Sequence, residues 1–235
     1  MSKTITIMQP YFMPYIGYWQ LMSAVDEFVI YDNIQYTKKG WINKNRFLRN
    51  GKPVVFSLPL KKGSSLLEVK DRYLSDDFEK EATELLRQME GAYKKAPNFE
   101  ETFMLFEKCL TYDNKNLFDF IYNSILVIKE YLEIKTKIII SSSIDMDHSL
   151  SAADKVKAIC HALDTKKYIN PIGGLELYLK EDFEKYGIKL NFHKALPFEY
   201  NQFNNEFEPW LTILDVLMFN SKGQVTTWLK SYELI

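Results

Sequence analysis

Three patterns in the 235-residue sequence predict an α/β fold with a largely parallel sheet, flanking helices and a helical middle segment. Residues 27–31 (EFVIY) are largely apolar without alternation, which is typical of a parallel strand covered on both faces. Apolar residues recur at helical spacing through much of residues 75–134. Strand-like and helical segments then alternate over residues 137–193, as expected of parallel strands joined by helical crossovers.

The N-terminal segment is expected to supply three strands and one short helix. Residues 4–8 alternate β-branched side chains and run into a proline, which favours a strand that enters a loop. The loop of residues 9–19 contains two prolines and a glycine, and a short helix follows through residues 21–24. Residues 27–31 form the second expected strand. Residues 53–58 (PVVFSL), between an Asn-Gly turn signal and a proline, form the third.

The remaining elements follow from the spacing of apolar residues. Asp76 with Glu79 three residues later is a capping-box-like helix start. Helices are expected over residues 76–91, 99–110, 116–133, 151–163, 175–186 and 210–219. Strands are expected over residues 137–141, 168–170 and 188–193.

The composition excludes several classes of protein. The chain can bury a core and contains no internal repeat, low-complexity tract or linker, which predicts one domain over residues 1–235 with a mostly helical insertion at about residues 75–134. Its 30 basic and 31 acidic residues give no reason to expect a nucleic-acid or membrane partner. No run approaches the roughly 18 apolar residues of a membrane span. Cys109 and Cys160 share no metal or redox spacing, and a cytoplasmic protein is therefore expected.

Residues 33–67 are unusual because they hold eight basic side chains and no acidic one. Aromatic residues are also dense in this part of the chain, with ten among residues 8–47. Cations, carboxamides and planar rings together suit a nucleotide diphosphate or a sugar, because they supply charge for phosphate, hydrogen bonds for hydroxyls and a ring face for stacking. The alternative is a solvated basic loop whose aromatic residues pack in the core.

Three loops are expected at the carboxyl ends of strands, where ligands bind in open α/β sheets. They cover residues 9–19, 32–46 and 141–143. The first two follow neighbouring strands, and their side chains are therefore expected to share a pocket. Gly17 in the first loop precedes a helix and makes that loop a candidate phosphate-binding turn, although its aromatic residues equally suit packing against the sheet.

Among the three histidines, His193 is the favoured acid or base, because it ends the last long strand and imidazole titrates near neutral pH. His161 lies near the apolar face of a helix and is expected to be structural. His148 follows two aspartates in a polar segment that is more typical of a loop than of a metal site, and no metal is expected. The sequence lacks the hydrolase elbow and the common zinc spacings.

Two segments are long and specific: residues 8–19 (MQPYFMPYIGYW) and residues 31–46 (YDNIQYTKKGWINKNR). They resemble the signature segments of the WbqC-like family, and weaker matches extend the resemblance over almost the whole chain. One difference is Lys44, where an arginine is expected; lysine keeps the charge but loses the bidentate fork. By analogy with nucleotidylyltransferase-like domains, the first loop between a strand and a helix also makes the expected fold Rossmann-like.

Bacterial members of this family are often encoded among genes for O-antigen and other surface polysaccharides. The resemblance implies a transferase of lipopolysaccharide synthesis that joins a small acyl or aminoacyl group, such as glycyl, to the amine of a nucleotide-linked deoxyamino sugar. The acyl donor would be a coenzyme A thioester, an aminoacyl-tRNA or, with ATP and magnesium, a free acid. No nucleic-acid partner is expected unless the donor is tRNA. Two alternatives stay open: an ATP-dependent ligase or nucleotidylyltransferase that activates a carboxylate, and a non-catalytic nucleotide-sugar-binding module.

In the transferase scheme, Asp32 or His193 accepts the proton of the amine. The binding residues supply cations for phosphate, rings for stacking and amides for hydroxyls. They are expected to be Gln9, Tyr11, Tyr15, Gln35, Tyr36, Lys38, Lys39, Trp41, Asn43, Lys44, Asn45, Arg46 and Gln202.

Overall fold

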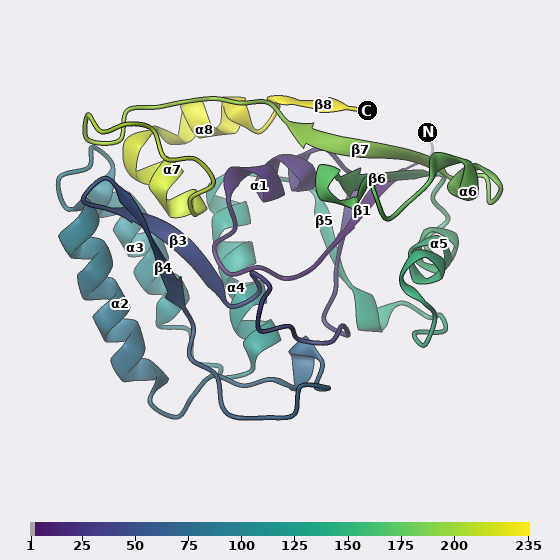
Figure 1. Cartoon of the computed structure of the whole chain (residues 1–235), viewed down its shortest axis with the longest axis horizontal. Coiled ribbons are helices and arrows are strands. Elements are labelled where there is room, and N and C mark those ends of the chain that lie inside the picture. Colours follow the sequence, from purple (N-terminus) through teal and green to yellow (C-terminus); the bar gives the residue numbers. More distant parts are fainter. Residues whose placement is uncertain (1–2) are drawn as a thin grey trace.

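The computed structural model describes residues 3–235 and contains a six-stranded sheet with helices on both faces (Figure 1). Its strands are β1 (Thr4–Met8), β2 (Glu27–Ile30), β5 (Lys137–Ile140), β6 (Lys167–Pro171), β7 (Lys189–Ala195) and β8 (Tyr232–Leu234). They lie in the order β5-β2-β1-β6-β7-β8, and all neighbours are parallel except β7 and β8. The chain winds away from β1 first on one side and then on the other, which is the Rossmann-like arrangement. The predicted α/β fold class is confirmed.

Helices divide between the two faces of this sheet. They are α1 (Ile16–Ser23), α2 (Phe78–Tyr93), α3 (Phe99–Leu110), α4 (Leu117–Tyr131), α5 (Ala152–Ala162), α6 (Lys180–Glu184), α7 (Ile213–Phe219) and α8 (Lys222–Trp228). Short 3₁₀ helices cover Val69–Asp71, Ser141–Ser143 and Ile172–Gly174. The larger core cluster contains residues of α1, α2, α3, α4, α7 and α8, whereas the smaller one contains residues of α5 and α6. Figure 1 shows these two groups on opposite sides of the sheet.

The alternation in β1 explains how one strand serves both cores. Ile5 and Ile7 are buried in the smaller cluster with Val156 and Ile159 of α5. Met8 packs against the larger cluster on the other face. Because β1 lies in the middle of the strand order and its side chains alternate between the two faces, the loop after it leaves from the centre of the sheet between the two helical layers.

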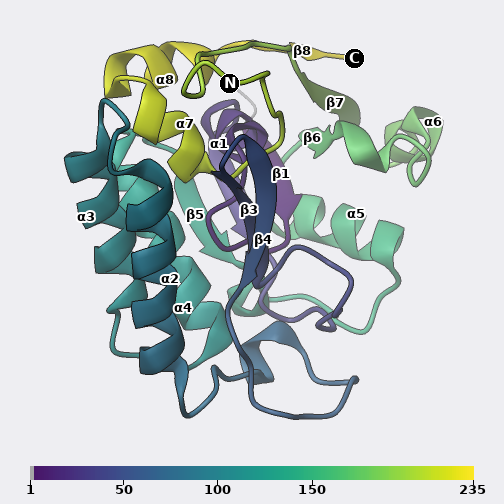
Figure 2. The same cartoon turned by 60° about the vertical axis from the view of Figure 1, so that its left-hand side comes forward.

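The third expected strand does not join the sheet. β3 (Lys44–Arg49) and β4 (Lys52–Ser57) instead form an antiparallel hairpin beside α2 (Figure 2). Asn50 and Gly51 form its turn with φ of 53° and 72°, a conformation that these two residue types adopt at low cost. The prediction that the loop extends to residue 46 was therefore wrong, because β3 begins at Lys44. Three basic residues among its six had obscured a strand whose buried positions include Asn45 and Phe47.

The C-terminal third differs from expectation in other places. Only α6 is α-helical within residues 175–186, because Leu175, Leu177 and Leu179 recur at every second position and stay exposed rather than forming one buried helical face. α8 and β8 were not predicted, since β8 has three residues and α8 contributes one buried apolar side chain, Val225. Within residues 3–235, none of the helices has the length and apolar character needed to cross a membrane.

Candidate functional site

Three segments that are distant in sequence meet beside the carboxyl end of β1. The Asn45 side chain donates hydrogen bonds to the carbonyls of Phe12 (3.2 Å) and Met13 (2.5 Å), and the Phe12 amide donates to the Ile42 carbonyl (2.9 Å). The Thr212 hydroxyl donates to the same Met13 carbonyl at 2.7 Å. The loop after β1, the start of β3 and the segment before α7 are thereby held together.

A cavity of about 240 Å³ opens between these segments, and we call it the hairpin cleft. It is lined by Tyr11, Pro14, Tyr15, Trp41, Asn45, Arg46 and Trp210. Trp41 and Trp210 are 45% and 62% exposed, although large aromatic side chains are usually mostly buried. The Tyr15 ring lies edge-on to Trp210 with 5.4 Å between ring centroids. The cleft therefore presents aromatic faces to solvent around one guanidinium.

Arg46 is the cation within the hairpin cleft. Its Nη2 donates to the Trp210 carbonyl at 3.1 Å, and its Nη1 lies 4.0 Å from a carboxylate oxygen of Glu208. The guanidinium lies 5.8 Å from the centroid of the Trp41 ring, and the ammonium of Lys44 lies 5.5 Å from the same ring. Because a guanidinium has about five N–H donors, these contacts leave part of its capacity for an anion.

The two tyrosines of the cleft are neutral donors. Burial raises the pKa of Tyr11 and of Tyr15 above the usual phenol value, and the neighbouring Tyr15 raises the pKa of Tyr11 further. The Tyr11 hydroxyl donates to the Gln9 side chain at 3.2 Å. A Cβ added to Gly17 would lie 2.3 Å from the Tyr15 ring, and glycine at this position therefore lets the ring fold back over α1.

The predicted binding residues are divided by the structure. Five of them line the hairpin cleft, and Gln9 and Lys44 contact its lining. Lys38 and Lys39 are exposed and lie outside the lining. Gln35 donates to the Ser65 carbonyl at 2.7 Å.

Tyr36 and Asn43 are hydrogen-bonded to each other away from the cleft lining. The Tyr36 hydroxyl donates to Asn43 Oδ1 at 2.9 Å, and the Asn43 side chain donates to the Leu58 carbonyl at 2.7 Å. The ring of Tyr36 also lies 4.9 Å from the guanidinium of Arg72. These contacts brace the segment between β2 and β3.

Gln202 belongs to a buried network around Asp215. The Asp215 carboxylate accepts hydrogen bonds from the hydroxyls of Tyr93 and Tyr200, both at 2.6 Å, and from Gln202 at 2.8 Å. Burial raises the pKa of Asp215, whereas these three donors lower it. The network joins α2 to α7 and to the segment that carries Trp210.

Asp32 lies in a second polar region, at the carboxyl end of β2. Its side chain accepts a hydrogen bond from the Ser142 amide at 2.9 Å. The side chain of its neighbour Asn33 donates to Nδ1 of His148 at 2.9 Å, and Nε2 of His148 lies 2.9 Å from the Ile144 carbonyl. This pattern places the imidazole proton on Nε2.

Lys155 of α5 completes this region, which we call the β2-end cluster: Asp32, Asn33, His148 and Lys155. Its ammonium lies 3.4 Å from the Asn33 carbonyl and 5.4 Å from the centroid of the Tyr31 ring. Burial lowers the pKa of Lys155, while the charges of Glu68 and Asp32 raise it. Sequence reasoning missed Lys155, although a lysine four residues before Ile159 on the apolar stripe of a helix was a visible signal.

His193 lies in neither region. It is buried on β7, and its ring is tilted by 33° against that of Tyr232, with 4.7 Å between centroids. Burial lowers its pKa to about 4. His193 is therefore neutral near pH 7, and it is not part of the hairpin-cleft lining.

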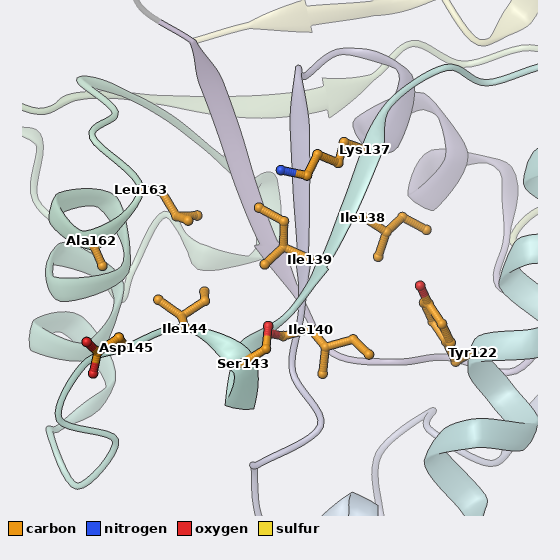
Figure 3. A pocket seen from close by; sticks show the side chains of 10 residues that line it. All are labelled: Tyr122, Lys137, Ile138, Ile139, Ile140, Ser143, Ile144, Asp145, Ala162 and Leu163. Atoms are coloured by element: carbon orange, nitrogen blue, oxygen red, sulfur yellow. The ribbon is translucent and has the colours of Figure 1, made fainter.

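The third predicted loop is the 3₁₀ turn of residues 141–143. The Ser143 hydroxyl donates to the Ile140 carbonyl at 2.7 Å. Ser143 lines a groove of about 710 Å³. Figure 3 shows this groove along the open edge of β5, between Tyr122 of α4 and Leu163 next to α5. Four isoleucines line this groove together with Lys137, Asp145 and Tyr122, and it lacks the arginine between two exposed tryptophans that marks the hairpin cleft. Among residues 3–235 there is also no group of three or more His, Cys, Asp or Glu that could hold a metal ion.

The fold and the hairpin cleft together define a Rossmann-like α/β protein with an aromatic, cationic cleft beside the carboxyl ends of its strands. The chain belongs to the WbqC-like protein family, whose family model matches residues 9–227. It is also similar to a protein of Mycobacterium tuberculosis named uncharacterized protein Rv1507c, with 26% identity over 231 residues. That alignment covers 97% of this chain and 98% of the relative.

Proposed function

We propose that this protein is a transferase that forms an amide between a small acyl or aminoacyl group and the amine of a nucleotide-linked deoxyamino sugar. The reaction would serve the synthesis of bacterial surface polysaccharide such as O-antigen. Membership of the WbqC-like family supports the proposal. The observation that carries it is the hairpin cleft, with its single guanidinium between exposed rings.

The cleft suits the two halves of such a substrate. Arg46 can hold a phosphate through charge-assisted hydrogen bonds, and Lys44 beside Trp41 adds a second positive charge. The faces of Trp41 and Trp210 can stack on a sugar or base. Tyr11 and Tyr15 stay protonated and can donate hydrogen bonds to hydroxyl or phosphate oxygens.

Amide formation needs a neutral amine, an activated carbonyl and correct positioning, and it requires no protein nucleophile. The amine nitrogen attacks the carbonyl carbon, the bond to the thiol or hydroxyl leaving group breaks, and the nitrogen loses a proton to a base. Glu208 lies 4.0 Å from Arg46 and is a further candidate base, in addition to the predicted Asp32 and His193, which lie outside the cleft lining. Sequence reasoning missed Glu208 and the cleft role of Trp210, although Glu-Pro-Trp in a polar segment was an available signal.

One feature supports a reaction in the cytoplasm. Cys109 and Cys160 are buried free thiols, as is usual in reducing compartments. A coenzyme A thioester or an aminoacyl-tRNA would supply the activated carbonyl, whereas a free acid with ATP and magnesium would do so in the ligase alternative.

The test is to incubate the protein with a panel of nucleotide-linked amino sugars and each donor, and to analyse the products by mass spectrometry. A product heavier by the acyl group, without AMP or pyrophosphate, supports the proposal. Release of AMP or pyrophosphate with every product would indicate the ATP-dependent ligase or nucleotidylyltransferase instead. Saturable binding without any product would indicate a non-catalytic binding module.

The proton acceptor can be identified with conservative variants in the same assay. Asp32→Asn, His193→Phe and Glu208→Gln should be compared at saturating substrate, with binding measured in parallel. The base is the residue whose change lowers kcat while leaving substrate affinity and stability nearly intact.

A further inference from the structure

A second cavity lies directly behind the wall of the hairpin cleft. It has a volume of about 380 Å³ and is mostly apolar, with Ile16, Phe198, Phe207, Leu211 and Val216 in its lining. Tyr15 and Trp210 line both cavities. We call the second cavity the apolar pocket. Together the two cavities reach the size range of small-molecule sites, about 300–1,000 Å³.

The shared wall is held in an unusual conformation. Trp210 has a φ of 61°, which is costly for a bulky side chain, and strained residues of this kind concentrate at ligand sites. Its ring is 62% exposed and its carbonyl accepts the hydrogen bond from Arg46. The same arginine that offers charge to a ligand therefore also holds the wall of the apolar pocket.

The two cavities differ in chemistry. The hairpin cleft contains Arg46, whereas the charged residue in the lining of the apolar pocket is the exposed Glu199. A ligand that fills both must therefore be anionic at one end and apolar at the other. Most of the pocket lining is apolar and suits an alkyl chain better than a polar group.

We propose that the site takes an amphiphilic anion, with its phosphate at Arg46 and an apolar chain of a few carbons in the apolar pocket. This inference deepens the proposed function and rests on it in one respect, that the apolar chain is the acyl group to be transferred. The favoured acyl group is then a short alkanoyl chain rather than glycyl.

The experiment measures binding of inorganic phosphate and of ethyl, butyl and hexyl phosphate by ligand-observed NMR. Each methylene buried in the pocket should tighten binding about fourfold. Ala195 lines the pocket and Ala152 is exposed on α5, which makes Ala195→Leu the filling variant and Ala152→Leu its matched control. Ala195→Leu should flatten the dependence on chain length while leaving phosphate binding unchanged, and Ala152→Leu should retain the full dependence.

Equal affinity of the wild-type protein for ethyl and hexyl phosphate, or an unchanged slope in Ala195→Leu, would overturn the inference. Folding of each variant is checked by urea denaturation. A second variant, Leu196→Ala, removes part of the apolar lining at the rim of the pocket. It should weaken hexyl phosphate more than ethyl phosphate. Chain-length dependence without turnover of any amino sugar would support the two-part site and contradict the proposed transferase function. Turnover of an amino sugar without chain-length dependence would support the transferase and overturn the two-part site.

Discussion

The hairpin cleft and the β2-end cluster both contain polar residues that follow a parallel strand, yet they differ in what their side chains are free to do. In the hairpin cleft, Trp41 and Trp210 are exposed and Arg46 retains unused donors. In the β2-end cluster, the side chains of Asp32, Asn33 and His148 bond to one another or to nearby backbone groups.

Polar residues at the end of a strand can therefore either bond to other groups of the protein or remain free to bind a ligand. Buried polar groups require hydrogen-bond partners, and the β2-end cluster supplies most of them internally, although Asn33 Oδ1 is buried without a partner. A side chain that is already satisfied inside the protein has little left for a ligand. We therefore expect changes in the hairpin cleft to affect binding, and changes in the β2-end cluster to affect stability.

The largest expected effect is the loss of ligand binding in Arg46→Ala. Hydrogen bonds to charged groups contribute about 1.5–3 kcal/mol, which corresponds to a weakening of roughly 10-fold to 100-fold for a UDP-linked amino sugar in calorimetry. The control is the double variant Lys38→Ala/Lys39→Ala, whose lysines are exposed outside the lining. It should change affinity by less than about twofold, and added salt should remove that change. If the double variant binds the amino sugar more weakly than Arg46→Ala does, the anion site lies at Lys38 and Lys39 and not at Arg46.

The next effect concerns the stability of the β2-end cluster. His148→Ala removes the acceptor for the buried Asn33 side chain, and an unsatisfied buried donor costs about 1–3 kcal/mol in the free energy of unfolding. Urea denaturation measures this loss, and His161→Ala, on the exposed side of α5, is the matched control. Amino-sugar affinity should not change. Weaker binding with unaltered stability would show that the β2-end cluster is a ligand site.

His193 gives a smaller effect that depends on pH. Its pKa is about 4 in the folded protein and near 6.5 when solvated, because burial disfavours the charged ring. Between these two values the unfolded state binds more protons, and the free energy of unfolding therefore falls as the pH drops from 6.5 to 4.

After allowance for solvent screening, this contribution is at most about 2 kcal/mol. Urea denaturation of His193→Phe, which keeps a ring beside Tyr232, should show a weaker loss of stability in this interval than the wild-type protein. His161→Phe should behave as the wild type. If both variants keep the wild-type slope, His193 does not carry the shifted pKa.

The smallest effect separates the two tryptophans of the hairpin cleft. Trp210 has a positive φ, and Trp210→Gly should therefore be more stable than Trp210→Ala by about 1 kcal/mol in urea denaturation. Trp41 has no positive φ, and its alanine variant should be at least as stable as its glycine variant. The same order of stability at both positions would mean that Trp210 carries no local strain.

The sequence predicted much of the sheet because its signals are local. The strands near residues 4–8, 27–31 and 137–141 carry β-branched or continuous apolar runs, and those runs form the central strands β1 and β2 and the edge strand β5. β3 was missed because its charged residues point away from the core and hide a two-residue period. The Asn-Gly turn was recognised, but the strand that it joins to β4 was not.

The predicted site was a single loop of basic, aromatic and amide residues, and the structure distributes that loop among several environments. Asn45 ties the first loop to the hairpin, and Asn43 bonds to Tyr36. Lys38 and Lys39 remain in solvent. Trp210 enters the cleft from more than 150 residues away, as its hydrogen bond with Arg46 across a separation of 164 residues shows.

By itself, the sequence determined the α/β class, the family and the kinds of side chain that stand near the ends of β1 and β2. Periodicity and side-chain chemistry are properties of neighbouring residues, and a sequence displays them directly. Only the tertiary structure decided which of these side chains are satisfied by one another and which still face solvent. That choice depends on contacts between segments far apart in the chain, and no local pattern records them.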